Sequence, residues 1–161
     1  MAADQKLFRM AMGRFATGVS IVTVALDGRV KGMTANAITS VSLEPLLLLV
    51  SVGRKSRTHS WLTKTARYGV SILTQSQRDI SDFFAKATDD PIPSSIPIRF
   101  SARGTPIIDG CLAFLDCPVV QTVEAGDHTL FLATVDDIHL APGEPPLLFY
   151  EGRYGRFSHS G

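Results

Sequence analysis

A tight-turn signal between two β-branched segments sets the first constraint on how this chain folds. Residues 19–26 (VSIVTVAL) are followed at once by Asp27-Gly28. An Asp-Gly pair favours a two-residue hairpin turn, because both positions tolerate a positive φ. The sequence therefore predicts an antiparallel hairpin whose second strand begins at Arg29.

Further strands are predicted along the rest of the chain. Residues 46–52 (LLLLVSV) are apolar at nearly every position, which is typical of a strand covered on both faces, and residues 68–73 predict another strand. Two long β-rich runs, 112–123 and 129–140, flank a turn that contains Gly126. They predict a second, longer hairpin.

Three short helices are expected among these strands. The first covers residues 4–15, with Asp4 as its N-cap and Gly18 marking its end, and the second covers residues 56–65, with Ser56 as its cap. The third is amphipathic, with Ile80, Phe83, Phe84 and Ala87 at helical spacing. Because strands dominate, the predicted architecture is a closed or partly closed antiparallel barrel with flanking helices.

Size, charge and hydropathy limit the classes of function. The 161 residues fit one domain, 1–161, and the net charge of +1 gives no field that favours nucleic acid. We expect a cytoplasmic protein without membrane attachment, since neither a signal peptide nor a run long enough to span a bilayer is present. Cys111 and Cys117 form no CxxC pair and are expected to be buried free thiols.

Several common sites are excluded by their missing motifs. The sequence has no GxGxxG after a strand, no GxxxxGK[ST], no HExxH and no GxSxG. The four histidines show no metal-ligand spacing, so no metal is predicted. The prolines and serines of residues 89–97 predict an irregular loop, which forms either a lid or an edge.

Two polar runs are candidate binding sites. Residues 31–42 (KGMTANAITSVS) carry small hydroxyl and amide side chains that suit a flat polar heterocycle, although the same residues are also ordinary at strand ends and turns. Residues 53–59 (GRKSRTH) combine cations and hydroxyls with the start of a helix. They form either a phosphate-binding loop or a solvated basic loop.

Two further runs leave the same choice open. His128 follows Gly126-Asp127 in the predicted hairpin turn, where it either donates to a nicotinamide or lies exposed at the loop tip. Residues 150–157 (YEGRYGRF) alternate arginine with aromatic side chains. They could stack on a dinucleotide or form a docked tail.

Taken in order, these runs resemble the short-chain flavin reductase components of two-component flavin-dependent monooxygenases, the FMN-binding split-barrel family. The match extends over nearly the whole chain. It is carried by Phe8-Arg9, GRFATGV at 13–19, GMTAN at 32–36, TSVSL at 39–43 with Pro45, RKSRT at 54–58, GDH at 126–128 and GRYG at 152–155. The resemblance implies a mainly β fold, a split β-barrel, assembled as a homodimer with flavin near the subunit interface.

The same resemblance implies roles for individual residues. It assigns Met33, Thr34, Ala35, Asn36, Ser51 and Val52 to the isoalloxazine ring, Ser56, Arg57 and Thr58 to phosphate, and Arg153 and Tyr154 to a segment near the cofactors. His128 matches a histidine near the nicotinamide and is the candidate catalytic residue. Ala37-Ile38 stands where family members commonly have Ser-Phe, so flavin affinity or preference is expected to differ.

The implied reaction is hydride transfer from NADH or NADPH to FMN or FAD, followed by delivery of the reduced flavin to a partner monooxygenase. Stacking of the two rings at about 3–3.5 Å is the main requirement. The alternatives are a flavin-binding module without turnover and a split-barrel oxidase of a pyridoxamine phosphate. The motifs at 126–128 and 152–155 favour the reductase.

Overall fold

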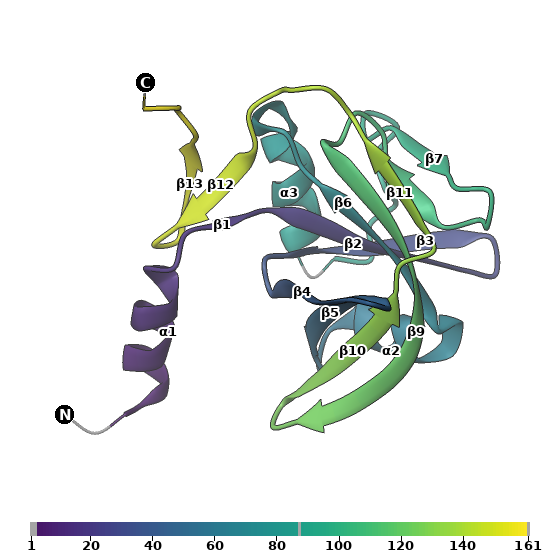
Figure 1. The fold of residues 1–161 in the computed structure, drawn as a ribbon, viewed down its shortest axis with the longest axis horizontal. Helices are drawn as coiled ribbons and strands as arrows, with labels where there is room; N and C mark the ends of the chain where they lie inside the picture. The colour runs from purple at the N-terminus through teal and green to yellow at the C-terminus, as the bar shows by residue number, and fades with distance from the viewer. Residues whose placement is uncertain (1–2, 87, 161) are drawn as a thin grey trace.

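The computed structural model describes residues 3–86 and 88–160, and most of this chain is β-structure (Figure 1). The helices are α1 Gln5–Gly13, α2 Arg57–Thr65 and α3 Arg78–Ala85, with a 3₁₀ turn at Gln75–Gln77. The strands are β1 Thr17–Gly18, β2 Ser20–Leu26, β3 Arg29–Ala35, β4 Ile38–Leu43, β5 Leu46–Gly53, β6 Arg67–Ile72, β7 Ile98–Phe100, β8 Pro106–Ile108, β9 Ala113–Ala125, β10 His128–Thr134, β11 Asp137–Leu140, β12 Leu147–Tyr150 and β13 Arg153–Arg156. No helix in the described ranges is long and apolar enough to cross a membrane.

The main sheet is an antiparallel barrel that does not close. Its strand order is β3-β2-β6-β9-β10-β5-β4, and β11 adds to β9. The two ends of this order, β3 and β4, are consecutive in the chain, yet within residues 3–86 and 88–160 they do not pair with each other. The predicted mainly β split barrel is confirmed, and its split lies at the link Asn36-Ala37 between the two edge strands.

The first predicted hairpin is confirmed. β2 pairs with β3 from Ser20↔Ala35 to Leu26↔Arg29. Asp27 and Gly28 form the turn with φ values of 52° and 72°, which is the conformation that an Asp-Gly pair favours. The turn therefore fixes the register that places residues 31–35 on an edge strand.

The second predicted hairpin is confirmed in its turn but wrong in its second strand. β9 and β10 pair around Gly126, whose φ is 61°. The run 129–140 was expected to be continuous, but it is divided into β10 and β11. The register of β10 shifts between Leu132 and Ala133, and β11 pairs with the first part of β9. The long strand β9 therefore pairs with β11 along its first part and with β10 along its second part.

β5 is less covered than its apolar sequence predicted. Leu48, Val50 and Val52 are buried, but Leu46 is exposed and the residues between the buried positions are only partly covered. The prediction of coverage on both faces is therefore wrong for the single chain. The sequence does not distinguish the two faces of β5, because leucine occurs on both of them.

The terminal segments extend from the barrel as an arm (Figure 1). Asp4 caps α1 as predicted, accepting a hydrogen bond from the Leu7 N–H at 2.7 Å, but the helix ends at Gly13, earlier than expected. The Gly13 carbonyl accepts from the Glu151 N–H at 2.8 Å, in the turn between β12 and β13. The C-terminal run is thus a hairpin that also pairs with β1.

The other two helices form where they were expected. Ser56 caps α2, and its Oγ accepts from the Thr58 N–H. On α3, Ile80 and Phe84 are buried and join a core cluster with Ile96 and Ile108. Ala87, which was predicted to continue this face, lies outside the described residues.

Both faces of β6 are closely packed. On the outer face, where β8 packs, a Cβ on Gly69 would lie 2.7 Å from the Phe114 ring and 2.8 Å from the Pro106 carbonyl. On the inner face, Tyr68 is fully buried in the barrel interior and donates to the carbonyls of Phe131 and Leu48. Buried side chains therefore fill the barrel interior around Tyr68.

The fold makes a prediction for the two cysteines, which are free and buried as the sequence predicted. Burial raises the pKa of Cys117 to about 12 and also raises the pKa of Cys111. At pH 8 only about one Cys117 in ten thousand would be a thiolate, the reactive form. We expect no reaction of the native protein with a chromogenic disulfide reagent, and two thiols per chain after unfolding in urea. Rapid labelling of the native protein would contradict the burial of both side chains.

Candidate functional site

A large cavity lies outside the barrel interior, between β3, the start of α2 and the end of α3. Its volume is about 1180 Å³. One wall is formed by residues 29–34 of β3 and 55–58 with Trp61, and the other by Phe83 to Lys86, residues 88–94 and residues 96–98, with Phe100. A cavity of this size accommodates a nucleotide cofactor.

The start of α2 supplies the donors of this cavity. Arg57 is the first residue of the helix, and it follows Lys55 and Ser56 on the loop from β5. The first turn of a helix attracts anions, although here Ser56 already accepts hydrogen bonds from the Thr58 and His59 N–H groups. All three predicted phosphate-binding residues, Ser56, Arg57 and Thr58, lie together on the cavity wall.

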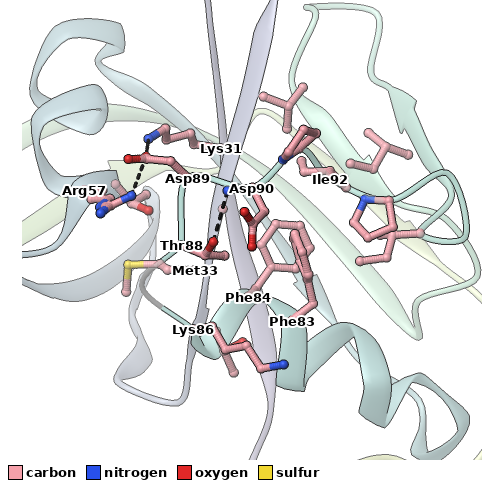
Figure 2. Close-up of a pocket in the computed structure, with 18 of the residues that line it drawn as sticks. Lys31, Met33, Arg57, Phe83, Phe84, Lys86, Thr88, Asp89, Asp90 and Ile92 are labelled. Carbon is pink, nitrogen blue, oxygen red and sulfur yellow. Dashed lines mark hydrogen bonds and ion pairs between the residues drawn. The ribbon is translucent and has the colours of Figure 1, made fainter.

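A carboxylate already pairs with the cations of this wall. The side chain of Asp89 contacts Lys31 Nζ at 3.2 Å and forms an ion pair with Arg57 (Figure 2). Hydrogen bonding from Lys31 and the charge of Arg57 lower the pKa of Asp89, so this carboxyl is ionised at neutral pH. The Pro-rich segment that the sequence left open as a lid or edge thus forms one side of the cavity.

Arg29 and Trp61 line the cavity but were missed by the sequence analysis, which included Lys31 only as part of the polar run 31–42. Arg29 and Lys31 lie 5.3 and 5.2 Å from the ring of Trp61, each within cation–π range. A signal for them existed: Arg29, Lys31 and Met33 alternate along β3 and so share one face, and Trp61 is four residues after Arg57 on α2. The packing of this face of β3 against α2 cannot be predicted from the spacing of residues within each element.

The position of α3 depends on a glycine of β3. A Cβ on Gly32 would lie 2.9 Å from the Phe84 ring and 3.2 Å from the Val22 carbonyl. The buried Phe84 ring therefore rests on bare backbone, and α3 approaches β3 closely enough to form the opposite wall of the cavity. The Thr34 hydroxyl strengthens this contact by donating to the Ser81 carbonyl at 2.6 Å.

A second, smaller cavity of about 250 Å³ adjoins the split of the barrel. Thr34, Ala35 and Asn36 line it together with Tyr154. The Tyr154 hydroxyl is 2.8 Å from the Ser81 Oγ, which ties the C-terminal hairpin to α3. The predicted run 33–36 is thus shared, since Met33 lines the large cavity, Ala35 and Asn36 the small one, and Thr34 both.

His128 lies beside the phosphate-loop candidate, at the first position of β10. It pairs with Gly53, and its Nε2 is 3.7 Å from where a Gly53 Cβ would be. Its Nδ1 is 2.7 Å from the Asp127 Oδ1. Hydrogen bonding from His128 lowers the pKa of Asp127, so the carboxylate holds the ring by Nδ1 and leaves Nε2 on the Gly53 side.

Four predicted residues do not line either cavity, and His128 is one of them. Val52 is fully buried in the barrel interior, and Ser51 is partly covered next to it, with its N–H bonded to the Ala37 carbonyl at 3.0 Å. Arg153 is exposed on β13, opposite Tyr150. The roles predicted for these four side chains stay predictions.

Comparison with known proteins identifies the family. Residues 12–158 match the flavin reductase-like domain. An NADH-dependent flavin reductase of a Rhodococcus species is 43% identical over 150 residues, which cover 91% of this chain and 82% of the relative. The NADH-dependent flavin reductase StyB of Pseudomonas fluorescens is 40% identical over 158 residues, covering 94% of this chain and 89% of that one.

Solved structures agree with this result. The flavin reductase PheA2 superposes with a TM-score of 0.90 at 43% identity, covering 98% of this chain and 100% of that one. The NADH:FAD oxidoreductase SgcE6 of Streptomyces globisporus, in complex with NAD and FAD fragments, gives a TM-score of 0.91 at 36% identity, with 98% of this chain and 97% of that one covered. The fold and site thus define a split-barrel flavoprotein.

The chain belongs to the flavin reductase-like family. The resemblance drawn from the sequence motifs is confirmed, and with it the predicted enzyme class, a nicotinamide-dependent flavin reductase.

The contact between Gly32 and Phe84 yields a prediction. Replacing Gly32 with Ala forces the Phe84 ring away from β3, so we expect a loss of about 1–3 kcal/mol in the free energy of unfolding and weaker flavin binding. Urea unfolding and flavin titration measure both. Gly18→Ala is the matched control, because nothing lies within 4 Å of its Cβ, and it should lose less than half as much stability. Equal effects of the two variants would contradict the role of the close approach.

Proposed function

We propose that this protein uses NADH to reduce FAD or FMN in the large cavity and that the reduced flavin passes to a separate monooxygenase. The observation that carries the proposal is the meeting of Lys31, the start of α2 and the small residues of β3 at one cavity. Relatives named as NADH-dependent flavin reductases support NADH as the donor, and SgcE6 supports FAD.

The residues present fit a flavin nucleotide. The described lining residues of the cavity include five basic and two acidic side chains, so the local charge favours an anion despite the near-neutral chain. Met33 and Thr34 line the cavity on the β3 side with one flexible and one short side chain. A flat ring can approach such a surface closely, while Arg57 and Lys31 are placed to hold phosphate.

When bound, a flavin accepts the hydride of a reduced nicotinamide. The protein's part is to position the reactants and to stabilise the charge that develops. In this proposal Met33, Thr34, Ala35 and Asn36 line the ring, Ser56, Arg57 and Thr58 hold the phosphate, and His128 orients the nicotinamide through Nε2. Ser51 and Val52 support the ring site from β5, and Arg153 and Tyr154 contribute from the C-terminal hairpin.

A homodimer is part of the proposal. Large apolar side chains are exposed on α1 and the adjoining loop and at the end of β4, with Phe8, Phe15 and Leu43 at 66%, 70% and 86% exposure. Exposed apolar groups of this size are typical of interaction surfaces. A second copy would cover the projecting arm and the partly covered face of β5.

The finer points of organisation are proposals as well. We propose that the barrel and arm act as one domain, supported by a family match that runs from residue 12 to residue 158. We also propose a cytoplasmic location, because reduced nicotinamides are regenerated inside the cell.

The proposed function is tested by mixing the purified protein with NADH or NADPH and either FAD or FMN. We expect the dihydronicotinamide absorbance to fall with multiple turnovers, fastest with NADH. Flavin binding without oxidation of either nicotinamide would show a flavin-binding module instead, and the assay distinguishes these outcomes directly.

His128 supplies a second test. The His128→Ala variant removes a side chain that lies beside Gly53, and we expect the KM for NADH to rise about tenfold, the cost of one hydrogen bond. His139→Ala is the control, because His139 is on β11 and pairs with Phe114, whereas His128 pairs with Gly53. If His128→Ala leaves both turnover and the NADH KM unchanged, His128 has no part in the reaction.

A further inference from the structure

The Pro-rich segment places the Asp89 carboxylate against Lys31 and Arg57, the two cations proposed to hold the phosphate of the flavin. Figure 2 shows the Asp89 carboxylate between Lys31 and Arg57, on the cavity side of residues 88–94. Both cations belong to the wall that carries the helix N-terminus. The Asp89 carboxylate therefore pairs with the two cations that are best placed to bind a phosphate group.

The geometry of Asp89 distinguishes it from a buried structural carboxylate. Its side chain is 71% exposed, whereas that of Asp116, which is bonded by Arg67, Ser101 and Thr105, has no exposed surface. An exposed ion pair contributes little to stability and opens at low cost. The pairing of Asp89 can thus be exchanged for another anion without disturbing the core.

The segment that carries Asp89 is anchored by residues that follow it in the chain. Ile96 is buried in the cluster that contains Ile80 and Phe84, and Ile92 packs against the same cluster. Closer to Asp89, the Asp90 N–H donates to the Thr88 hydroxyl at 3.0 Å. Opening the ion pairs needs only a local movement before Ile92, while the rest of the cavity wall stays in place.

We propose that Asp89 is a specificity-determining residue that competes with the flavin phosphate for Lys31 and Arg57. This inference rests on the proposed function, since it takes the large cavity as the flavin site. A ligand that binds only the open state has its affinity reduced by the fraction of protein in that state. Asp89 therefore weakens the binding of phosphorylated flavins and leaves riboflavin, which has no phosphate, unaffected. A reductase that passes its flavin to another protein needs such readily reversible binding.

The test compares two flavins that differ only in the phosphate. Fluorescence quenching gives the Kd of FMN and of riboflavin for the wild type and for Asp89→Asn, which keeps the shape of the side chain and removes its charge. If the open state is about one tenth of the population, the FMN Kd should fall about tenfold in Asp89→Asn. The riboflavin Kd should change by less than about twofold.

A control variant separates local competition from a general charge effect. Asp79→Asn removes the same charge from α3, at an exposed residue outside the cavity lining, and should shift the FMN Kd by less than about twofold. Equal shifts in the two variants, an unchanged or weaker FMN affinity in Asp89→Asn, or an equal gain for riboflavin would each overturn the inference while leaving the flavin site intact. If neither flavin binds to the wild type or to any variant, the proposed function is wrong as well.

Discussion

The structure depends on one break in hydrogen bonding, the failure of β3 to pair with β4 across the barrel. A closed antiparallel barrel of this size fills its interior with side chains and has no exposed edges. Here the chain passes directly from one edge strand to the other through Asn36-Ala37, while the sheet runs the long way round between them. The interior remains packed around the buried Tyr68 and Phe131, and the polar run 31–42 is left along the split. If the barrel were closed, the backbone N–H and C=O groups at the edges of β3 and β4 would instead be bonded to each other.

The elements around this split are held by contacts of very different kinds. Phe84 packs on the bare backbone of Gly32, a contact fixed by shape, and Thr34 and Tyr154 add hydrogen bonds to Ser81. Opposite α3, the start of α2 supplies Ser56, Thr58 and the charged side chain of Arg57. The α3 side of the cavity therefore presents the rings of Phe83 and Phe84 and the α2 side is polar and charged, which suits a ligand with a flat ring at one end and phosphate at the other.

Two aspartates show how burial decides what a carboxylate does. Burial alone would raise the pKa of Asp116, but donors from Arg67, Ser101 and Thr105 hold it below its usual value, so this group fastens the β7–β8 turn to the sheet. Asp89 is exposed and contacts two cations at the cavity. Solvent competes for the ion pairs of the exposed Asp89 and not for the bonds of the buried Asp116. Only Asp89 can therefore exchange its partners for a ligand.

Local chemistry made much of this fold predictable from the sequence. The Asp27-Gly28 turn, the Asp4 and Ser56 caps and the amphipathic face of α3 each follow from interactions within a few residues, and each is present. The division of residues 129–140 into two strands depends on pairing with distant parts of β9, which spacing does not reveal. The phosphate-loop candidates were found because cations, hydroxyls and a helix start are adjacent in sequence. Their contact with Asp89 and the neighbouring Trp61 platform comes from tertiary packing and was missed.

The central claim is that the flavin nucleotide binds between β3 and the start of α2. Hydrogen–deuterium exchange resolved by peptides, with and without saturating FAD, tests it directly, because ligand contact slows exchange of the amides that it covers or stabilises. The account predicts slower exchange in residues 31–36 and 55–59 and little change in the β7–β8 turn at residues 101–105. Protection confined to segments away from both walls of the cavity would contradict it.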